Sequence, residues 1–125
     1  MVVSFTRLGA RSPISLLAGG GFQFGGMPHR GAVLVSPDGI YAWTPAGAAS
    51  DDSNLLRFLD EEQAVRGDFL LLGTGSKSLL PSARLRDEAD KRGLGLEAMN
   101  TGAACRTYNV LLAERRFFCA ALLTI

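Results

Sequence analysis

The sequence predicts a single α/β domain built on a mixed β-sheet, and three observations support this prediction. From residue 69 onward the pattern reads strand, helix, strand, helix, strand, which implies right-handed crossovers and mostly parallel pairing. Earlier, two apolar runs flank the turn sequence Ser-Pro-Asp-Gly at 36–39, as in an antiparallel hairpin. The 125 residues are 47% hydrophobic and 20% charged, as in one globular domain. We therefore expect one compact three-layer domain over residues 1–125, with about three helices.

The N-terminal segment carries the weakest pattern. Residues 1–18 offer only a short strand around residues 2–5. Three glycines at 19–21 then lead into Phe22-Gln23-Phe24, whose apolar, polar, apolar alternation predicts a short strand closed by Gly25 and Gly26. No helix pattern follows these glycines. We expect them at turn positions with positive φ and not in a phosphate cradle.

The hairpin and the helix after it follow from local chemistry. Runs 32–35 and 40–43 are the predicted strands, because Pro37 presets the first corner of a turn and Asp38-Gly39 tolerates the left-handed conformation. After a loop at 45–50, a helix is expected to begin at a cap supplied by Asp51, Asp52 or Ser53. Its core-facing stripe consists of Leu55, Leu56, Phe58 and Leu59.

The C-terminal half supplies the alternating units. The unbroken apolar run 69–72 suits a strand covered on both faces. Pro81 fits the first turn of a helix that stops at Gly93. A strand at 94–99, a helix at 102–114 with Thr101 as its N-cap, and an apolar strand at 117–125 complete the domain. The last segment suits either an interior strand or an edge that pairs with a second copy in a homodimer.

The predicted site lies where two glycine-containing loops would meet. If strands 69–72 and 94–99 are parallel neighbours, their C-terminal ends bring 73–75 beside 100–102, where open α/β sheets bind ligands. The helix that starts there exposes unpaired amides and the positive end of its dipole. The residues that we place in this pocket are Gly73, Thr74, Gly75, Asn100, Thr101, Gly102, Cys105, Arg106 and Asn109.

Two interpretations of these residues stay open. In the first, the helix start biases the Cys105 thiol toward thiolate, and Arg106 clamps a small anion. In the second, Cys105 packs in the core, and the polar side chains tie the helix to the adjoining loops. A nucleophilic cysteine needs a base, and the single histidine, His29, lies in a distant loop. The second interpretation is therefore favoured, with an enzyme the less favoured class.

Composition excludes several other functions. The formal net charge of +1 gives no long-range field for nucleic acid. With one histidine, two distant cysteines and no carboxylate cluster, neither a metal site nor a cofactor is predicted. No run approaches the ~20 apolar residues of a membrane span. We expect a cytoplasmic protein, with a mitochondrial location as the alternative, because residues 1–37 contain arginines and no acid.

One longer motif resembles a known family. The run Met-Asn-Thr-Gly-Ala-Ala-Cys-Arg-Thr-Tyr-Asn at 99–109 is specific, and Leu-Gly-Thr-Gly at 72–75, Phe-Gln-Phe-Gly at 22–25 and Gly-Ala-Val-Leu-Val at 31–35 accompany it. Over residues 20–123 the chain resembles the small α/β domain family of largely unknown function that includes mitochondrial respiratory complex I assembly factor 3 and uncharacterised bacterial and archaeal proteins. It departs from the family at Asn100, where aspartate is common, and at Gln23, where arginine is common.

The resemblance implies a function without catalysis. It points to a binding or assembly module with protein partners from the respiratory chain or membrane biogenesis. The alternative is a small-anion-binding protein or an enzyme that uses the helix start at Thr101–Arg106, with Cys105 as a thiolate. The two departures remove one acid and one base from the predicted pocket, which weakens any mechanism that needs an ion pair there.

Overall fold

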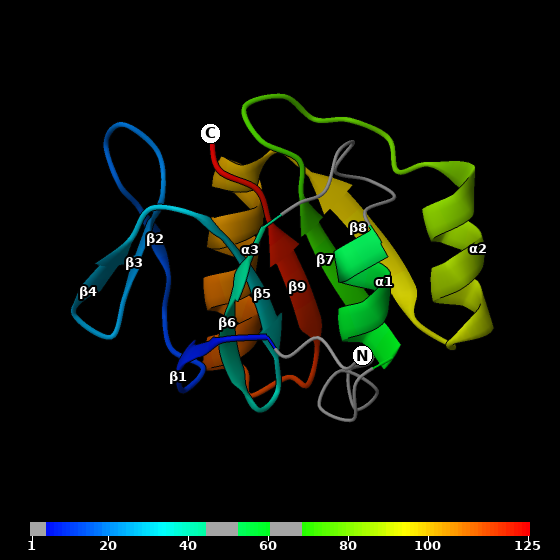
Figure 1. Cartoon of the computed structure of the whole chain (residues 1–125), viewed down its shortest axis with the longest axis horizontal. Helices are drawn as coiled ribbons and strands as arrows, with labels where there is room; N and C mark the ends of the chain where they lie inside the picture. Colours follow the sequence, from blue (N-terminus) through cyan, green and yellow to red (C-terminus); the bar gives the residue numbers. More distant parts are fainter. Residues whose placement is uncertain (1–4, 45–52, 61–68) are drawn as a thin grey trace.

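The computed structural model describes residues 5–44, 53–60 and 69–125. Within these ranges the chain forms a six-stranded mixed sheet, a three-stranded antiparallel sheet and three α-helices (Figure 1). The predicted mixed α/β fold is confirmed. The predicted loop at 45–50, the helix caps at Asp51 and Asp52, and residues 2–4 of the predicted first strand lie outside the described residues.

The large sheet joins the two halves of the chain. In spatial order its strands are β1 (Arg7–Gly9), β6 (Gly39–Trp43), β5 (Ala32–Ser36), β9 (Cys119–Leu122), β7 (Phe69–Gly73) and β8 (Gly95–Met99). The predicted hairpin is confirmed, since β5 and β6 are antiparallel with Ser36 opposite Gly39. The left-handed conformation expected at Asp38-Gly39 is wrong, because neither residue has a positive φ. Strand β7 is parallel to both β8 and β9, and β9 is antiparallel to β5. Strand β9 therefore connects the hairpin to the parallel units.

The core consists of two layers, one on each face of this sheet. Helices α1 (Ser53–Asp60) and α2 (Ala83–Lys91) cover one face, while α3 (Thr101–Ala113) and the small sheet cover the other (Figure 1). Ala120 and Ala121 of the central strand are fully buried, and each faces a different layer. Their small side chains let the covering elements approach the sheet closely.

The predicted starts of α2 and α3 need correction. Pro81 precedes α2 instead of lying in its first turn, because Ser82 is the N-cap and its Oγ accepts from the Leu85 amide at 3.1 Å. Thr101 is the first residue of α3 and not its N-cap. Asn100 is the cap, with Oδ1 accepting from the Ala103 amide at 2.8 Å. The Thr101 hydroxyl instead makes hydrogen bonds with Gly75 and Leu123, outside the helix.

Most of the small sheet is not predicted from the sequence. It contains β2 (Ser15–Leu16), β3 (Phe22–Phe24) and β4 (Met27–His29), in that order and antiparallel. Only β3 is predicted, because its Phe-Gln-Phe sequence alternates, whereas β4 and β1 of the large sheet are equally short but show no alternation, and β2 has only two residues. The predicted positive φ is confirmed at Gly19, Gly20, Gly21, Gly25 and Gly26. The final strand is shorter than predicted and ends at Leu122.

Two of these glycines allow a matched test of the loop before β3. Both have left-handed φ, +84° at Gly19 and +95° at Gly21, but only a Cβ at Gly21 would clash, at 2.6 Å from the His29 carbonyl oxygen. Gly19→Ala should lower the free energy of unfolding by about 1 kcal/mol, the cost of the conformation alone. Gly21→Ala should lower it by about 3 kcal/mol, measured by urea unfolding. Equal losses would show that the His29 carbonyl of β4 can move away from a Cβ at position 21 at little energetic cost.

Candidate functional site

The two glycine-containing loops meet at one end of the sheet. The Thr74 amide donates to the Met99 carbonyl at 2.8 Å, and the Thr101 amide donates to the Gly75 carbonyl at 2.8 Å. Gly75 has a φ of +91°, a conformation that L residues rarely adopt. Parallel pairing of β7 and β8 thus brings 73–75 and 100–102 side by side. Whether a ligand binds at this junction stays a prediction.

The buried hydroxyl of Thr101 links three elements at this junction. Its Oγ1 accepts from the Gly75 amide at 2.9 Å and donates to the Leu123 carbonyl at 2.7 Å. Gly73 allows this proximity, because a Cβ there would lie 3.0 Å from Oγ1. One hydroxyl therefore joins the end of β7, the end of β9 and the start of α3. The Gly75 amide, which a bound anion would need, is already satisfied within the protein.

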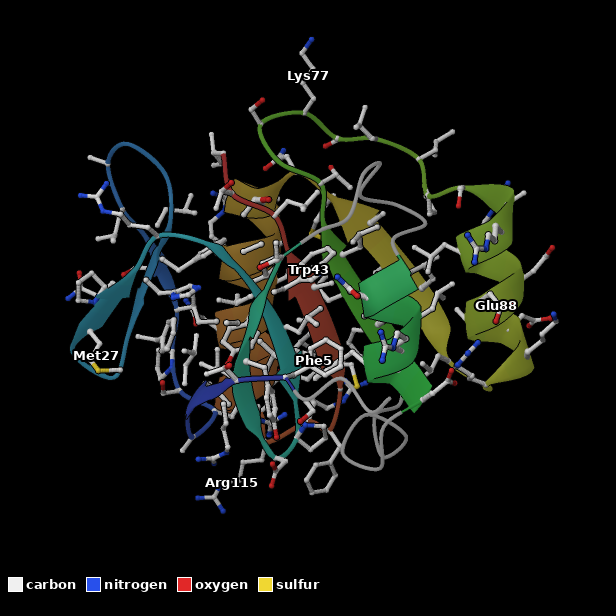
Figure 2. The ribbon with its side chains drawn as sticks, in the orientation of Figure 1. Phe5, Met27, Trp43, Lys77, Glu88 and Arg115 are labelled. Atoms are coloured by element: carbon white, nitrogen blue, oxygen red, sulfur yellow. The ribbon has the colours of Figure 1, made fainter. Side chains whose placement is uncertain are left out.

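A second threonine supports the loop at 76–80. The Thr74 hydroxyl donates to the Lys77 carbonyl at 2.5 Å and accepts from the Leu79 amide at 3.2 Å. The Ser78 hydroxyl accepts from the Asn100 amide at 3.1 Å. The residues of this anchored segment, hereafter the β7–α2 loop, are all exposed, and Lys77 lies at one end of the molecule (Figure 2). Its leucines are exposed: Leu79 is 58% accessible and Leu80 is 88% accessible.

Cys105 and Arg106 lie on different sides of α3. Cys105 is buried in the core layer beneath the helix, whereas Arg106 is exposed. Burial raises the pKa of the Cys105 thiol to about 11, and the positive charge of Arg106 offsets only part of that shift. Burial therefore opposes the bias toward thiolate that the first interpretation needs, and it agrees with the packing that the sequence favours. At neutral pH the thiol is protonated and packed against apolar neighbours.

Asn109 has a structural partner that the sequence does not reveal. Its Oδ1 accepts from the Ile14 amide at 2.9 Å, and its Nδ2 donates to the Ile14 carbonyl at 2.8 Å. One residue earlier, the Tyr108 hydroxyl donates to the Ser12 carbonyl at 2.9 Å. These contacts fasten the N-terminal segment to α3. Asn109 thus satisfies the backbone amide and carbonyl of Ile14, which have no strand partner at this point. It lies about two helical turns from the junction of the loops.

The structure also contains a hollow that the sequence does not predict. A groove of about 400 Å³ lies between edge strand β8 and α3. It is lined by Phe69, Gly95, Leu96, Glu97, Met99, Thr107, Leu111 and Arg116. None of the predicted pocket residues lines this groove. Helix α3 packs mainly over β7, the neighbour of β8 in the sheet, and the groove lies beside it along the edge strand.

Two features are absent from the described ranges of the chain. Over residues 5–44, 53–60 and 69–125, no three His, Cys, Asp or Glu side chains gather as metal ligands would. No helix in the same ranges combines the length and the apolar character needed to cross a bilayer.

Comparison with known proteins identifies relatives along most of the chain. A family model described as a protein of unknown function (DUF498/DUF598) matches residues 14–123. NADH dehydrogenase [ubiquinone] 1 alpha subcomplex assembly factor 3 of Danio rerio is 36% identical over 106 residues, which cover 82% of this chain and 59% of that protein. An uncharacterised protein of Rhodobacter capsulatus is 37% identical over 111 residues, or 89% and 83% of the two chains.

A solved structure extends the likeness to three dimensions. The crystal structure of a protein titled as an outer membrane protein from Bartonella henselae superposes with a TM-score of 0.76 at 38% identity, covering 91% of this chain and 95% of that one. The chain spans little more than half the length of the zebrafish relative, but nearly all of this solved structure.

The Thr101 hydroxyl predicts a specific stability pattern. Thr101→Val keeps the shape but leaves the Gly75 amide and the Leu123 carbonyl unsatisfied, so the free energy of unfolding should fall by about 3 kcal/mol. Thr101→Ser retains the hydroxyl and should cost about 1 kcal/mol. Urea unfolding of both variants checks this. Similar losses in the two would contradict a structural role for the hydroxyl.

Cys105 predicts a reactivity pattern that separates packing from nucleophilicity. In a Cys119→Ala background, iodoacetamide at pH 8 should label folded protein at least about a hundredfold more slowly than protein in urea, because the thiolate is scarce when the thiol is buried. Since folding raises this pKa, the folded state binds the proton more tightly, and stability should fall as the pH rises from about 9 toward 11. Rapid labelling of the folded protein would restore the nucleophile hypothesis.

Proposed function

We propose that this chain, which belongs to the family described as DUF498/DUF598, is a non-catalytic protein-binding module that assists the assembly of respiratory complex I. Support comes from the zebrafish and Xenopus tropicalis relatives, which are named as assembly factors of NADH dehydrogenase and match 82% of this chain. The identities are 36% and 29%, and each relative is considerably longer.

The observation that carries the proposal is the β7–α2 loop. Leu80 is 88% accessible and lies next to Leu79, which is 58% accessible. Burying one leucine side chain against a partner contributes about 1.5–3 kcal/mol. Such a pair in a loop outside any helix or strand does not serve the core of its own domain. We therefore assign the loop as the surface that contacts the partner.

The support beneath this loop favours binding as well. Thr74 holds the backbone at Lys77 and Leu79, and Asn100 is joined to Ser78. A loop that is already ordered loses less conformational entropy on binding than a mobile one. The Thr-Gly and Asn-Thr-Gly residues that looked like a ligand pocket thus acquire a different purpose. They fix the shape of a protruding contact element.

The partner surface follows from the chemistry of the loop. Two leucine side chains call for an apolar depression on the partner. Lys77, exposed at the tip of the same loop, favours a carboxylate at its rim. The opposing hypothesis of an anion-binding or thiolate enzyme has no comparable support. The Cys105 thiol is buried, and His29 belongs to β4 of the small sheet instead of the junction.

A genetic experiment tests the proposal. Deletion of the gene in its own host should lower the amount of fully assembled complex I on native gels, and the wild-type gene should restore it. A Leu79→Ser, Leu80→Ser double variant should fail to restore assembly, because it loses the apolar contact while both changes lie on the surface. Immunoblots should show the double variant at wild-type abundance.

A matched substitution separates the two hypotheses. Cys105→Ala removes the thiol that the enzyme hypothesis requires, and it should restore assembly as well as the wild type does. Unchanged complex I in the deletion strain would contradict the proposal outright. Failure of Cys105→Ala at normal abundance, together with success of the leucine variant, would favour the thiol instead.

A further inference from the structure

The end of the molecule farthest from the β7–α2 loop is rich in cations. Figure 2 labels Lys77 at one extreme and Arg115 at the other. Around the end of α3 lie Arg11, Arg115, Arg116 and Phe117, which we call the arginine pole. Phe117 is 60% accessible although it is a large aromatic residue. Glu114, the C-cap of α3, is the adjoining acid in the sequence.

Two of the three arginines at this pole contact aromatic rings, and Arg11 also donates from Nη1 to the Arg116 carbonyl at 2.9 Å. Phe69 and Phe118 stack with centroids 5.6 Å apart at 12°. The Arg11 Cζ lies 5.3 Å from the Phe118 centroid, and the Arg116 Cζ lies 6.0 Å from that of Phe69. Within the described part of the chain, neither these two arginines nor Arg115 has an ion pair with an acidic side chain. Among the described residues, their contacts with rings and with a backbone carbonyl leave the positive charges without a neutralising carboxylate.

Arg115 occupies a backbone position where glycine is usual. Its φ is +58°, and it follows α3 in a turn in which its amide donates to Leu112 and the Arg116 amide donates to Leu111, at 3.0 and 3.1 Å. This is the C′ position of a helix-ending motif, at which glycine avoids the strain that a side chain causes. Despite this strain, the position holds Arg115, whose cationic side chain lies at the end of the molecule opposite Lys77 (Figure 2).

We propose that the arginine pole docks on the surface of an anionic lipid bilayer. The guanidinium groups contact lipid phosphates, and Phe117 enters the interface between headgroups and acyl chains. A few cations combined with one apolar anchor give the weak, reversible attachment that suits peripheral proteins. Nucleic acid is disfavoured, because strong binding to it rests on many phosphate contacts and the net charge is only +1.

This orientation leaves the opposite end accessible. With the arginine pole on the bilayer, the β7–α2 loop faces away from the lipid (Figure 2). The inference does not depend on the proposed assembly function, because it rests on different residues and on a different binding partner.

Fluorescence provides a direct test. Trp43 is the only tryptophan and is 3% accessible, so its emission should not respond to vesicles. Phe117→Trp should give an emission that shifts to the blue with vesicles of equal phosphatidylcholine and phosphatidylglycerol, and not with phosphatidylcholine alone. Leu80→Trp, at the opposite end, should show no shift with either vesicle.

Cosedimentation with the same mixed vesicles measures the charges. Arg115→Gly and Arg116→Gln should each weaken binding about fivefold, the loss expected for one cation near an anionic surface. Arg84→Gln, on the exposed face of α2, is the matched control and should bind as the wild type does. Arg115→Gly should also unfold at a higher urea concentration, because it relieves the backbone strain. Weaker binding by a more stable protein cannot result from misfolding.

Three outcomes would overturn the inference. One is an unshifted Phe117→Trp emission at low salt, and another is an equal shift for Leu80→Trp. The third is tighter binding to single-stranded DNA than to mixed vesicles, which would assign the pole to nucleic acid. None of these outcomes bears on the leucine variants in the assembly experiment, so failure of one proposal leaves the other to its own test.

Discussion

The hydroxyl of Thr101 is the contact on which this end of the structure depends. It joins β7 through Gly75 and the chain after β9 through Leu123, at the point where α3 begins. Because the Gly75 amide, the Leu123 carbonyl and the hydroxyl are all satisfied together, the parallel strands end in a closed polar junction. The same junction fixes Thr74 beneath the β7–α2 loop. The hydrogen bonds inside this junction therefore also order the exposed β7–α2 loop.

The sequence predicts those features that local chemistry or chain direction determines. The hairpin follows from Pro37, which presets the first corner of a turn between two apolar runs, although Asp38 and Gly39 do not adopt the expected left-handed φ. The meeting of 73–75 with 100–102 follows from parallel pairing alone, because consecutive parallel strands end at the same edge. Neither deduction requires knowledge of any side-chain contact, which is why both are confirmed.

What the sequence does not predict depends on tertiary partners. Cys105 near a helix start looks activated, but the helix turns it toward the core, and desolvation outweighs the adjacent arginine. Asn109 bonds to Ile14 across 95 positions, a pairing that no local pattern records. Thr101 resembles a cap, yet Asn100 performs that task because Thr101 is needed between two strands. In each case, a long-range contact decides between alternatives that the local sequence leaves open.

The position of β9 constrains how the domain forms during synthesis on the ribosome. It lies between β5 and β7 in the sheet, although it is the last of these strands to be translated. Until residues 119–122 leave the exit tunnel, the hairpin and the β7–β8 unit have no strand between them and expose the edges that β9 will later cover. A nascent chain of this fold therefore completes its sheet only after residues 119–122 have been synthesised.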